Sequence, residues 1–495
     1  MNRFNERHGQ LIYYLFNKQS WCSFGELCKS TGVPRSTMWR DLNFIQSVLP
    51  TGWSIERNEL QGVRLIKPIK GTLECVWTHL KRKNTYFQIV ELIILENGVS
   101  INNIVEKVHI SRSTFYRQLE KIEEVIESAG IHLEKNPYRL QGDEKKIRRF
   151  IMQYLEFKIM NTSDLDNFDG EAFKSSLLQQ LSDSSVSLHI GALHRLTMIM
   201  YIANIRIGHG CYVSFPAQIL KEYQESKYFR IAKNLFPFMA KCPTRNIQMK
   251  EILFFTLYLL VEEEPLNRTK HLGYIRSQYK RGKGDSISNS LSELSAYTNI
   301  DLFQDDKFLY KYVQTIRRIT FDSQFNTDTR VNNMLPFLPY VEKNPLFKFI
   351  EGMKIKSFST ASFCLGKLEV LEIFLLVQAA LLRKKNQTII KTALICRTYI
   401  EKEYISEVLR FHFGQQLRIT SLDIADSEIL QRNNEYDLII STIGNGLFIT
   451  HIPNLKVSSF PSSAELIEIR QFINQYFIER WEIDERLIYP FEGNY

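Results

Sequence analysis

The sequence predicts a multidomain, mostly α-helical protein that ends in a small α/β domain. A pattern with helical spacing occurs twice in the first quarter of the chain, the middle is helical in character almost throughout, and the last part alternates apolar strands with helices. At 495 residues the chain also exceeds the usual size of a single domain. The expected domains are 1–70, 71–160, 164–282, 290–386 and 388–495.

The composition limits the class of protein. Apolar residues make up 44% of the chain, enough to form hydrophobic cores. The net charge of +9 favours a polyanionic partner without identifying one, because a basic composition suits nucleic acid and membrane surfaces alike. The seven cysteines are scattered without a CxxC pair, so neither a disulfide framework nor a metal module is indicated. Without a signal peptide or a membrane-spanning run, a cytoplasmic protein with no cofactor is expected.

The repeated pattern reads "VPRSTMWRDL" at 33–42 and "ISRSTFYRQL" at 110–119. A short amphipathic stretch and a brief turn precede each copy, which is typical of a helix-turn-helix. In the second helix of each pair, apolar residues recur at spacings of four, three and four and form one face. These residues are Met38, Leu42, Ile45 and Leu49 in the first copy and Phe115, Leu119, Ile122 and Ile126 in the second.

The opposite face of each second helix carries hydrogen-bond donors and cations near its start, which is what reading the major groove requires. A solvated basic face is the alternative, but the duplication favours DNA. The candidate DNA-binding residues of the main recognition surface are Arg112, Ser113, Thr114, Tyr116 and Arg117. Those of a second, more structural surface are Arg35, Ser36, Thr37, Trp39 and Arg40.

Each helix pair is followed by a stretch that predicts a β-hairpin. The stretches are "GWSIERNELQGVRLIKP", with a turn at Asn58, and "GIHLEKNPYRLQG", with a turn at Asn136-Pro137. The hairpins would be wings, so the sequence predicts two winged helix-turn-helix units. The basic clusters "HLKRK" at 79–83 and "KKIRR" at 145–149 either add phosphate contacts or are ordinary solvated helix ends.

The middle of the chain predicts two helical bundles, divided by a polar break near 282–290. They contain no Gly-rich phosphate loop, no HExxH motif and no cluster of carboxylates on one helix face, so an enzyme is not expected. In "LHIGALHRLTMIMYIANIRIG", the apolar positions share one face and leave His194 on the opposite, accessible side. An exposed histidine is usually an ordinary surface residue, so the pattern alone leaves its role open.

The last domain alternates strands and helices in a way that predicts a parallel α/β sheet. Its strands are "TALIC", "LRITSLDI", "YDLIIST" and "LKVSSF". Cys396 ends the first strand, where such folds often bind anions through the following loop. Because the loop "RTYIEKE" contains no glycine, a buried structural cysteine is favoured over a phosphate site.

With these parts in this order, nearly the whole chain resembles the Mga/AtxA family of transcriptional regulators from Gram-positive pathogens. The resemblance is strongest in the paired "RST" helices and in the C-terminal segments "KEYISEVL" and "YDLIISTIGNGLFITHIPNLKVSSFPSSAELIEI". It implies that the bundles are phosphotransferase-system (PTS) regulation domains, abbreviated PRD, and that the last domain is similar to enzyme IIB. It also implies binding to promoter DNA and self-association, expected as a homodimer, through the C-terminal region.

The resemblance assigns His194, in "ALHRL", to the first phosphoacceptor position of a PRD. Other positions depart from the family pattern, because Tyr258 and Ala379 stand where a second histidine often lies. The loop after Cys396 is degenerate as well, so we expect that domain to serve assembly. PTS phosphocarrier proteins and RNA polymerase are further expected partners.

The leading hypothesis is a cytoplasmic DNA-binding regulator, an activator of virulence-type genes whose activity or oligomerisation is modulated through the PRD-like domains. A phosphoryl carrier of the sugar PTS using His194 and Cys396 is one alternative, although a carrier would not need DNA-binding units. A PRD-containing RNA-binding antiterminator is another, although its small β-rich RNA-binding module does not match this N-terminus.

Overall fold

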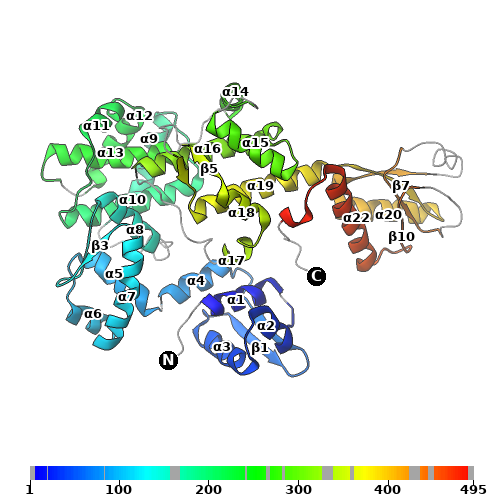
Figure 1. Cartoon of the computed structure of the whole chain (residues 1–495), viewed down its shortest axis with the longest axis horizontal. Helices are drawn as coiled ribbons and strands as arrows, with labels where there is room; N and C mark the ends of the chain where they lie inside the picture. Colours follow the sequence, from blue (N-terminus) through cyan, green and yellow to red (C-terminus); the bar gives the residue numbers. More distant parts are fainter. Residues whose placement is uncertain are drawn as a thin grey trace. The chain divides into compact units, whose positions relative to one another are not determined.

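The computed structural model describes residues 6–18, 20–82, 84–155, 168–239, 242–262, 268–280, 285–325, 338–356, 362–422, 435–443 and 451–488. The chain divides into two compact units, both mostly helical (Figure 1). The first contains the chain up to residue 271 together with residues 317–339, and the second contains residues 272–316 and 340–490. Within the described ranges, no helix combines the length and apolar character needed to cross a bilayer.

The N-terminal region has a helix-turn-helix followed by a β-hairpin. Its elements are α1 (Glu6–Lys18), α2 (Phe24–Thr31), α3 (Arg35–Val48), β1 (Ser54–Asn58) and β2 (Gly62–Ile66). Ser23 caps α2, and Gly32 ends it in the left-handed conformation at φ 68°, which glycine adopts without strain. The antiparallel hairpin turns after Asn58, as the sequence predicts. The region has a hydrophobic core of its own, which includes Met38, Leu42 and Ile45 of α3.

The next region repeats this arrangement. Its elements are α4 (Leu73–Arg82), α5 (Thr85–Glu96), α6 (Ile101–Val108), α7 (Arg112–Ser128), β3 (His132–Glu134), β4 (Arg139–Gln141) and α8 (Glu144–Leu155). The second predicted hairpin is present, with antiparallel β3 and β4. A residue ahead of the helix pair bridges to the hairpin region in both copies, Cys22 to Val63 and Val99 to Tyr138.

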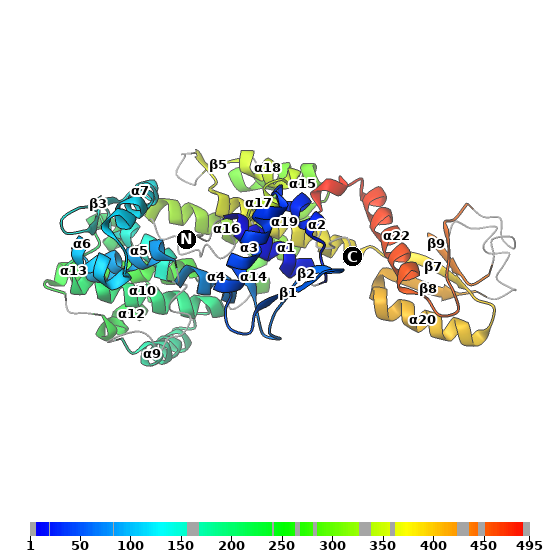
Figure 2. The same cartoon turned by 90° about the horizontal axis from the view of Figure 1, so that it is seen from below.

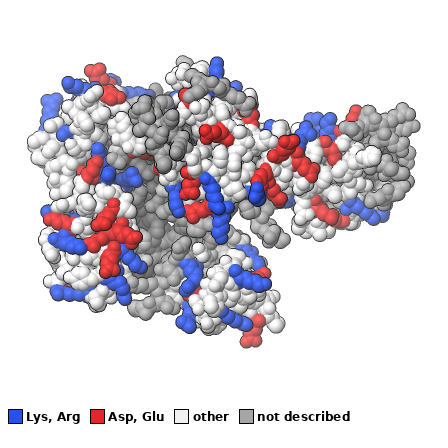
Figure 3. Space-filling model, viewed as in Figure 1, with Lys and Arg blue, Asp and Glu red and all other residues white. Residues whose placement is uncertain are grey.

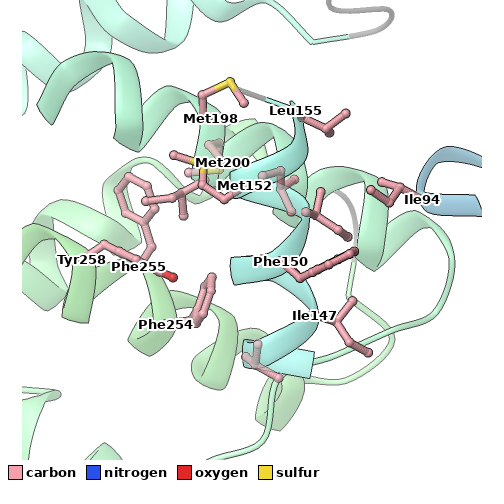
Figure 4. Packing of buried hydrophobic residues seen from close by; sticks show 14 of the residues in the cluster. Ile94, Ile147, Phe150, Met152, Leu155, Met198, Met200, Phe254, Phe255 and Tyr258 are labelled. Carbon is pink, nitrogen blue, oxygen red and sulfur yellow. The ribbon is translucent and has the colours of Figure 1, made fainter. Parts of the chain in front are cut away.

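The first helical bundle follows. It contains α9 (Gly170–Asp183), α10 (Ile190–Gly208), α11 (Ala217–Tyr223), α12 (Lys227–Asn234), η2 (Phe236–Phe238) and α13 (Arg245–Glu262). One hydrophobic core runs from α5 into this bundle, so the second helix-turn-helix region and the bundle are packed as one body. Figure 4 shows Met152 of α8 beside Met200 of α10, with Phe254 and Phe255 of α13 in the same cluster.

Buried charges also join these two regions. Arg148 of α8 donates to Glu251 of α13 at 2.6 and 3.0 Å and to Glu144 at 2.9 Å. Arg206 of α10 donates to Glu144 at 2.9 and 2.8 Å. Burial opposes the charge of Arg148, but the two carboxylates outweigh it and raise its pKa. These four residues are named here the buried charge network.

The second unit contains the second bundle. Its elements are α14 (Arg268–Gln278), which begins in the first unit, α15 (Ser286–Thr298), η3 (Leu302–Gln304), α16 (Asp306–Phe325), which ends in the first unit, α17 (Leu338–Val341), α18 (Pro345–Gly352), β5 (Lys354–Lys356), β6 (Ser362–Cys364) and α19 (Lys367–Gln387). The short antiparallel hairpin β5–β6 was not predicted, because three-residue strands are too short to show a two-residue periodicity.

The C-terminal domain contains a parallel sheet. Its elements are β7 (Ile390–Ile395), α20 (Tyr399–Phe413), η5 (Gly414–Gln416), β8 (Leu417–Ser421), β9 (Leu438–Ser441), β10 (Asn454–Lys456), α22 (Ser463–Trp481) and η7 (Glu485–Leu487). The strand order is β10-β9-β7-β8, and every neighbouring pair is parallel, as predicted (Figure 2). Helices α20 and α22 share one core with the sheet. The short helix predicted between β8 and β9 lies outside the described residues.

Candidate nucleic-acid interface

The "RST" of each repeat forms the first turn of a helix. Helix α3 begins at Arg35 and α7 at Arg112. Ser111 caps α7 by accepting a hydrogen bond from the backbone N–H of Thr114 at 3.2 Å, whereas Pro34 precedes α3 without a side-chain cap. The predicted recognition residues therefore stand where a helix can enter the major groove with its N-terminal end.

Most of the ten predicted DNA-binding residues are exposed. Trp39 and Tyr116 are 46% and 54% exposed, and only Thr37 and Thr114 are half-buried. The predicted apolar faces are buried on the other side, except that Leu49 follows the end of α3 and is half-buried. The structure thus separates an apolar face from a polar one on both helices, as the spacing predicts.

In the first copy, Trp39 is held between α2 and the hairpin. Its ring lies 5.5 Å from that of Phe24, and the Arg57 guanidinium lies 4.3 Å from its centre. Arg35 lies over Phe24 at 5.6 Å. Arg40 has no hydrogen bond or ion pair within the part of the chain that the structure describes. Arg40 is therefore the more available cation of this helix, while Trp39 also fixes the hairpin.

In the second copy, Arg112 donates to the side-chain amide oxygen of Asn102 of α6 at 2.7 Å. Ser113 lies 2.9 Å from the capping Ser111. Arg117, like Arg40, has no such partner among the described residues. The two equivalent arginines are thus both exposed and both available to a ligand.

The two recognition helices differ in acidic residues, which the repeat did not indicate. Helix α7 continues with Glu120, Glu123, Glu124 and Glu127, whereas the single acid of α3, Asp41, is buried against Arg7 and His8. In the view of Figure 3, basic side chains predominate over the first copy, and charges of both signs mix over the second. The favourable potential for DNA is therefore confined to the first turns of α7 but extends further along α3.

The basic clusters "HLKRK" and "KKIRR" offer fewer cations to DNA phosphate than the sequence suggests. Arg148 of "KKIRR" is 2% exposed within the buried charge network, so it is not available to phosphate. Lys145 lies over the Phe215 ring at 4.9 Å. The lysine and arginine side chains of "HLKRK" lie outside what the structure describes. Two of the hairpin cations are also neutralised, since Arg64 pairs with Glu56 at 2.7 Å and Arg139 pairs with Glu134.

His194 lies near the start of α10 and is half-buried, less accessible than predicted. Burial lowers its pKa, and the positive charges of Lys174 and Arg195 lower it further. Arg195 is itself paired with Glu262 at 2.6 Å. The imidazole is therefore neutral at pH 7 and lies in a positive environment. Tyr258 of α13 is buried, and Ala379 of α19 is half-buried.

Cys396 lies at the end of β7, beside the end of β9. A carboxylate of the chain itself accepts the hydrogen bonds available at this edge of the sheet. Glu401 accepts hydrogen bonds from Ser459 at 2.6 Å, from Thr442 at 3.1 Å and from the Arg397 backbone N–H at 3.1 Å. Burial raises the pKa of the Cys396 thiol to about 11, and the negative charge of Glu401 adds to the increase. The thiol is therefore protonated at pH 7 and a poor nucleophile.

Replacement of Glu401 by Gln is expected to destabilise the α/β domain at neutral pH and progressively less as the pH falls below the ordinary pKa of a glutamate. The hydrogen bonds from Ser459 and then Thr442 lower the pKa of Glu401, so its stabilisation is present above the pKa of the unfolded chain and is lost as pH falls. Hydrogen–deuterium exchange of β7 and α20 between pH 3 and 7 would measure this. Exposed Glu403→Gln is the control, and a difference between wild type and E401Q that does not depend on pH would contradict the prediction.

The comparisons with known proteins agree with this geometry. A model described as the Mga helix-turn-helix domain matches residues 71–155, which contain α7. The capsule synthesis positive regulator AcpB of Bacillus anthracis is 20% identical, covering 95% of this chain and 98% of that protein. The anthrax toxin expression trans-acting positive regulator of the same organism is 22% identical, covering 94% and 97%. A putative trans-acting regulator of Streptococcus pneumoniae is 21% identical, covering 89% and 92%.

The duplicated helices with exposed cations and the matched helix-turn-helix model define a DNA-binding regulator of transcription. The similarity to positive regulators extends over nearly the whole chain, which supports the expected resemblance to the Mga/AtxA family of transcriptional regulators.

Proposed function

We propose that the protein is a sequence-specific activator of transcription that binds promoter DNA through α3 and α7. The observation that carries this proposal is the pair of recognition helices with free, equivalent arginines, Arg40 and Arg117. The relatives in Bacillus anthracis are named as positive regulators of capsule synthesis and of toxin expression, which supports activation, of virulence-type genes in particular. Such a protein acts in the cytoplasm and contacts RNA polymerase.

Regulation through the helical bundles, acting as PRD-like domains, is the second part of the proposal. A neutral His194 has a ring nitrogen free to accept a phosphoryl group from a PTS phosphocarrier protein. Lys174 and Arg195, whose charges reach the imidazole, would stabilise the roughly two added negative charges of a phosphate.

Self-association through the C-terminal domain, as a homodimer, is the third part. Several large apolar side chains of α20 and of the segment before α22 are exposed, and Tyr404 and Phe460 have ring centres 5.4 Å apart. Tyr399, Ile400 and Phe460 are 73%, 79% and 77% exposed. Apolar side chains exposed together are typical of a protein interface, which supports a second copy as the occupant.

The phosphoryl-carrier alternative has less support, because a carrier needs a reactive thiolate and an open anion site beside it. Here the thiol of Cys396 has a raised pKa, and Glu401 occupies the adjacent hydrogen-bond donors. Both observations favour a structural role for this edge of the sheet.

The test is a salt titration of binding to DNA fragments from the region upstream of the gene for this protein. Arg117→Ala and Arg40→Ala are each expected to weaken binding by about 1 to 3 kcal/mol. If an arginine reads a base, its loss affects some fragments more than others. If it contacts only phosphate, the loss is uniform and the salt slope falls by about one.

The matched control is Lys107→Ala, which removes a cation of the neighbouring helix α6 that is already paired with Glu96. It is expected to leave binding nearly unchanged. Unchanged binding after Arg40 and Arg117 are replaced together would show that the repeated helices serve packing and would overturn the proposal.

A further inference from the structure

The two recognition helices share their polar residues Arg, Ser, Thr and the second Arg over the first two turns, with an exposed aromatic residue in both, and their exposed faces diverge after that. Arg35, Ser36 and Arg40 of α3 correspond to Arg112, Ser113 and Arg117 of α7. One turn after the shared arginine, α3 has Asn43, whereas α7 has Glu120. Both side chains are exposed, and neither has a hydrogen bond or ion pair within the described ranges.

Helical geometry places the divergent position in the same strip as the shared residues. At about 100° per residue, Asn43 lies within roughly 60° of both Ser36 and Arg40 around the helix, and Glu120 has the same relation to Ser113 and Arg117. The buried residues Leu42 and Leu119 lie on the other side. A helix that presents Ser36 and Arg40 to the groove therefore presents Asn43 as well.

The two side chains have different base partners. An asparagine amide can bond both N6 and N7 of adenine, and a glutamate accepts from the N4 amino group of cytosine. Glutamate is repelled by phosphate, so Glu120 is compatible with a bound α7 only where it faces base edges and not the backbone.

We propose that Asn43 and Glu120 are specificity-determining residues, with Asn43 reading an adenine and Glu120 a cytosine. The two units of one chain then read different base sequences, and the binding site of one protomer is not a simple repeat. This inference rests on the proposed function, because it requires α3 and α7 to enter the major groove.

The experiment is selection of bound sequences from a random DNA pool by the full-length protein, followed by affinity measurements on the selected fragments. Asn43→Ala and Glu120→Ala are each expected to remove the preference for one base at one position, by about 5- to 150-fold, while the salt slope stays unchanged. The exchange variants Asn43→Glu and Glu120→Asn are expected to change the preferred base from adenine to cytosine and from cytosine to adenine, respectively.

Asn103→Ala and Glu106→Ala are the matched controls, since both remove exposed side chains of the same types from α6, outside the recognition helices. Tighter binding of Glu120→Ala to every sequence would show that Glu120 only repels phosphate and would overturn its assignment. Base preferences unchanged in N43A and N43E would overturn the assignment of Asn43. If the Arg40 and Arg117 variants lose binding, either of these results leaves the proposed function standing. If the arginine variants bind normally, the proposed function and this inference both fail.

Discussion

Replacement of Glu251 by alanine is expected to destabilise the first unit by about 3 to 5 kcal/mol, because it leaves a buried arginine short of a carboxylate. Glu251 is fully buried and accepts both guanidinium bonds from Arg148 as well as the Val213 backbone N–H at 3.0 Å. Arg148 is also buried and has no access to solvent that could replace the lost partner. After the replacement, two arginines share the one remaining carboxylate, Glu144.

The expected loss of stability in E251A comes from removing only one partner of the Arg148–Glu251 ion pair. Replacing Arg148 and Glu251 together by methionine leaves the Arg206–Glu144 pair intact, so no unpaired charge remains, and is expected to cost less than Glu251→Ala alone. Glu171→Ala, which removes the exposed partner of Lys174, is the surface control and is expected to change stability by at most about 1 kcal/mol.

Hydrogen–deuterium exchange gives the measurement, because it reports each helix separately. Since α8 of the helix-turn-helix region and α13 of the bundle share one core and the buried charge network, both are expected to lose protection together in E251A. Loss of protection in α13 alone, with α5–α8 unchanged, would contradict the view that the two regions are one body.

The sequence predicted those features that depend on local spacing. The apolar residues of α3 and α7, the two hairpins and the parallel C-terminal sheet all follow from periodicity and turn residues that are close in the chain. In the candidate interface, local spacing also placed Arg40 and Arg117 on exposed faces.

The burial of a charged residue that depends on a partner far away in the chain could not be predicted from the neighbouring sequence. Arg148 looks like one more surface cation of "KKIRR" because its partner Glu251 comes 103 residues later. Asp41 looks exposed until Arg7 and His8, more than thirty residues earlier, are placed beside it. A charged residue is buried only with a partner, and a single sequence does not show which partner it has.

Truncation after Trp481 is expected to unfold the second bundle, although it removes only residues that follow the last long helix. Ile483 and Leu487 are 4% and 2% exposed, and their loss leaves cavities that cost about 2 to 5 kcal/mol each. Gln378 of α19 donates to the Leu487 carbonyl at 2.6 Å, and Asn344 donates to the Arg486 carbonyl at 3.1 Å. Both amides are buried, so the loss of these hydrogen bonds adds to the cost, by about 1 kcal/mol each.

Hydrogen–deuterium exchange of α18 and α19 would measure the unfolding of the second bundle. The protection of both helices is expected to fall to that of an unfolded segment. Phe460→Ser is the matched control, since Phe460 is 77% exposed and its replacement removes an apolar surface side chain without touching the bundle. Retained protection in the truncated protein would show that the bundle is complete without residues 482–488. If protection is lost, a truncated protein that fails to self-associate does not test the interface, because its second bundle is unfolded as well. Point replacements such as F460S are then the variants that can test the interface by itself.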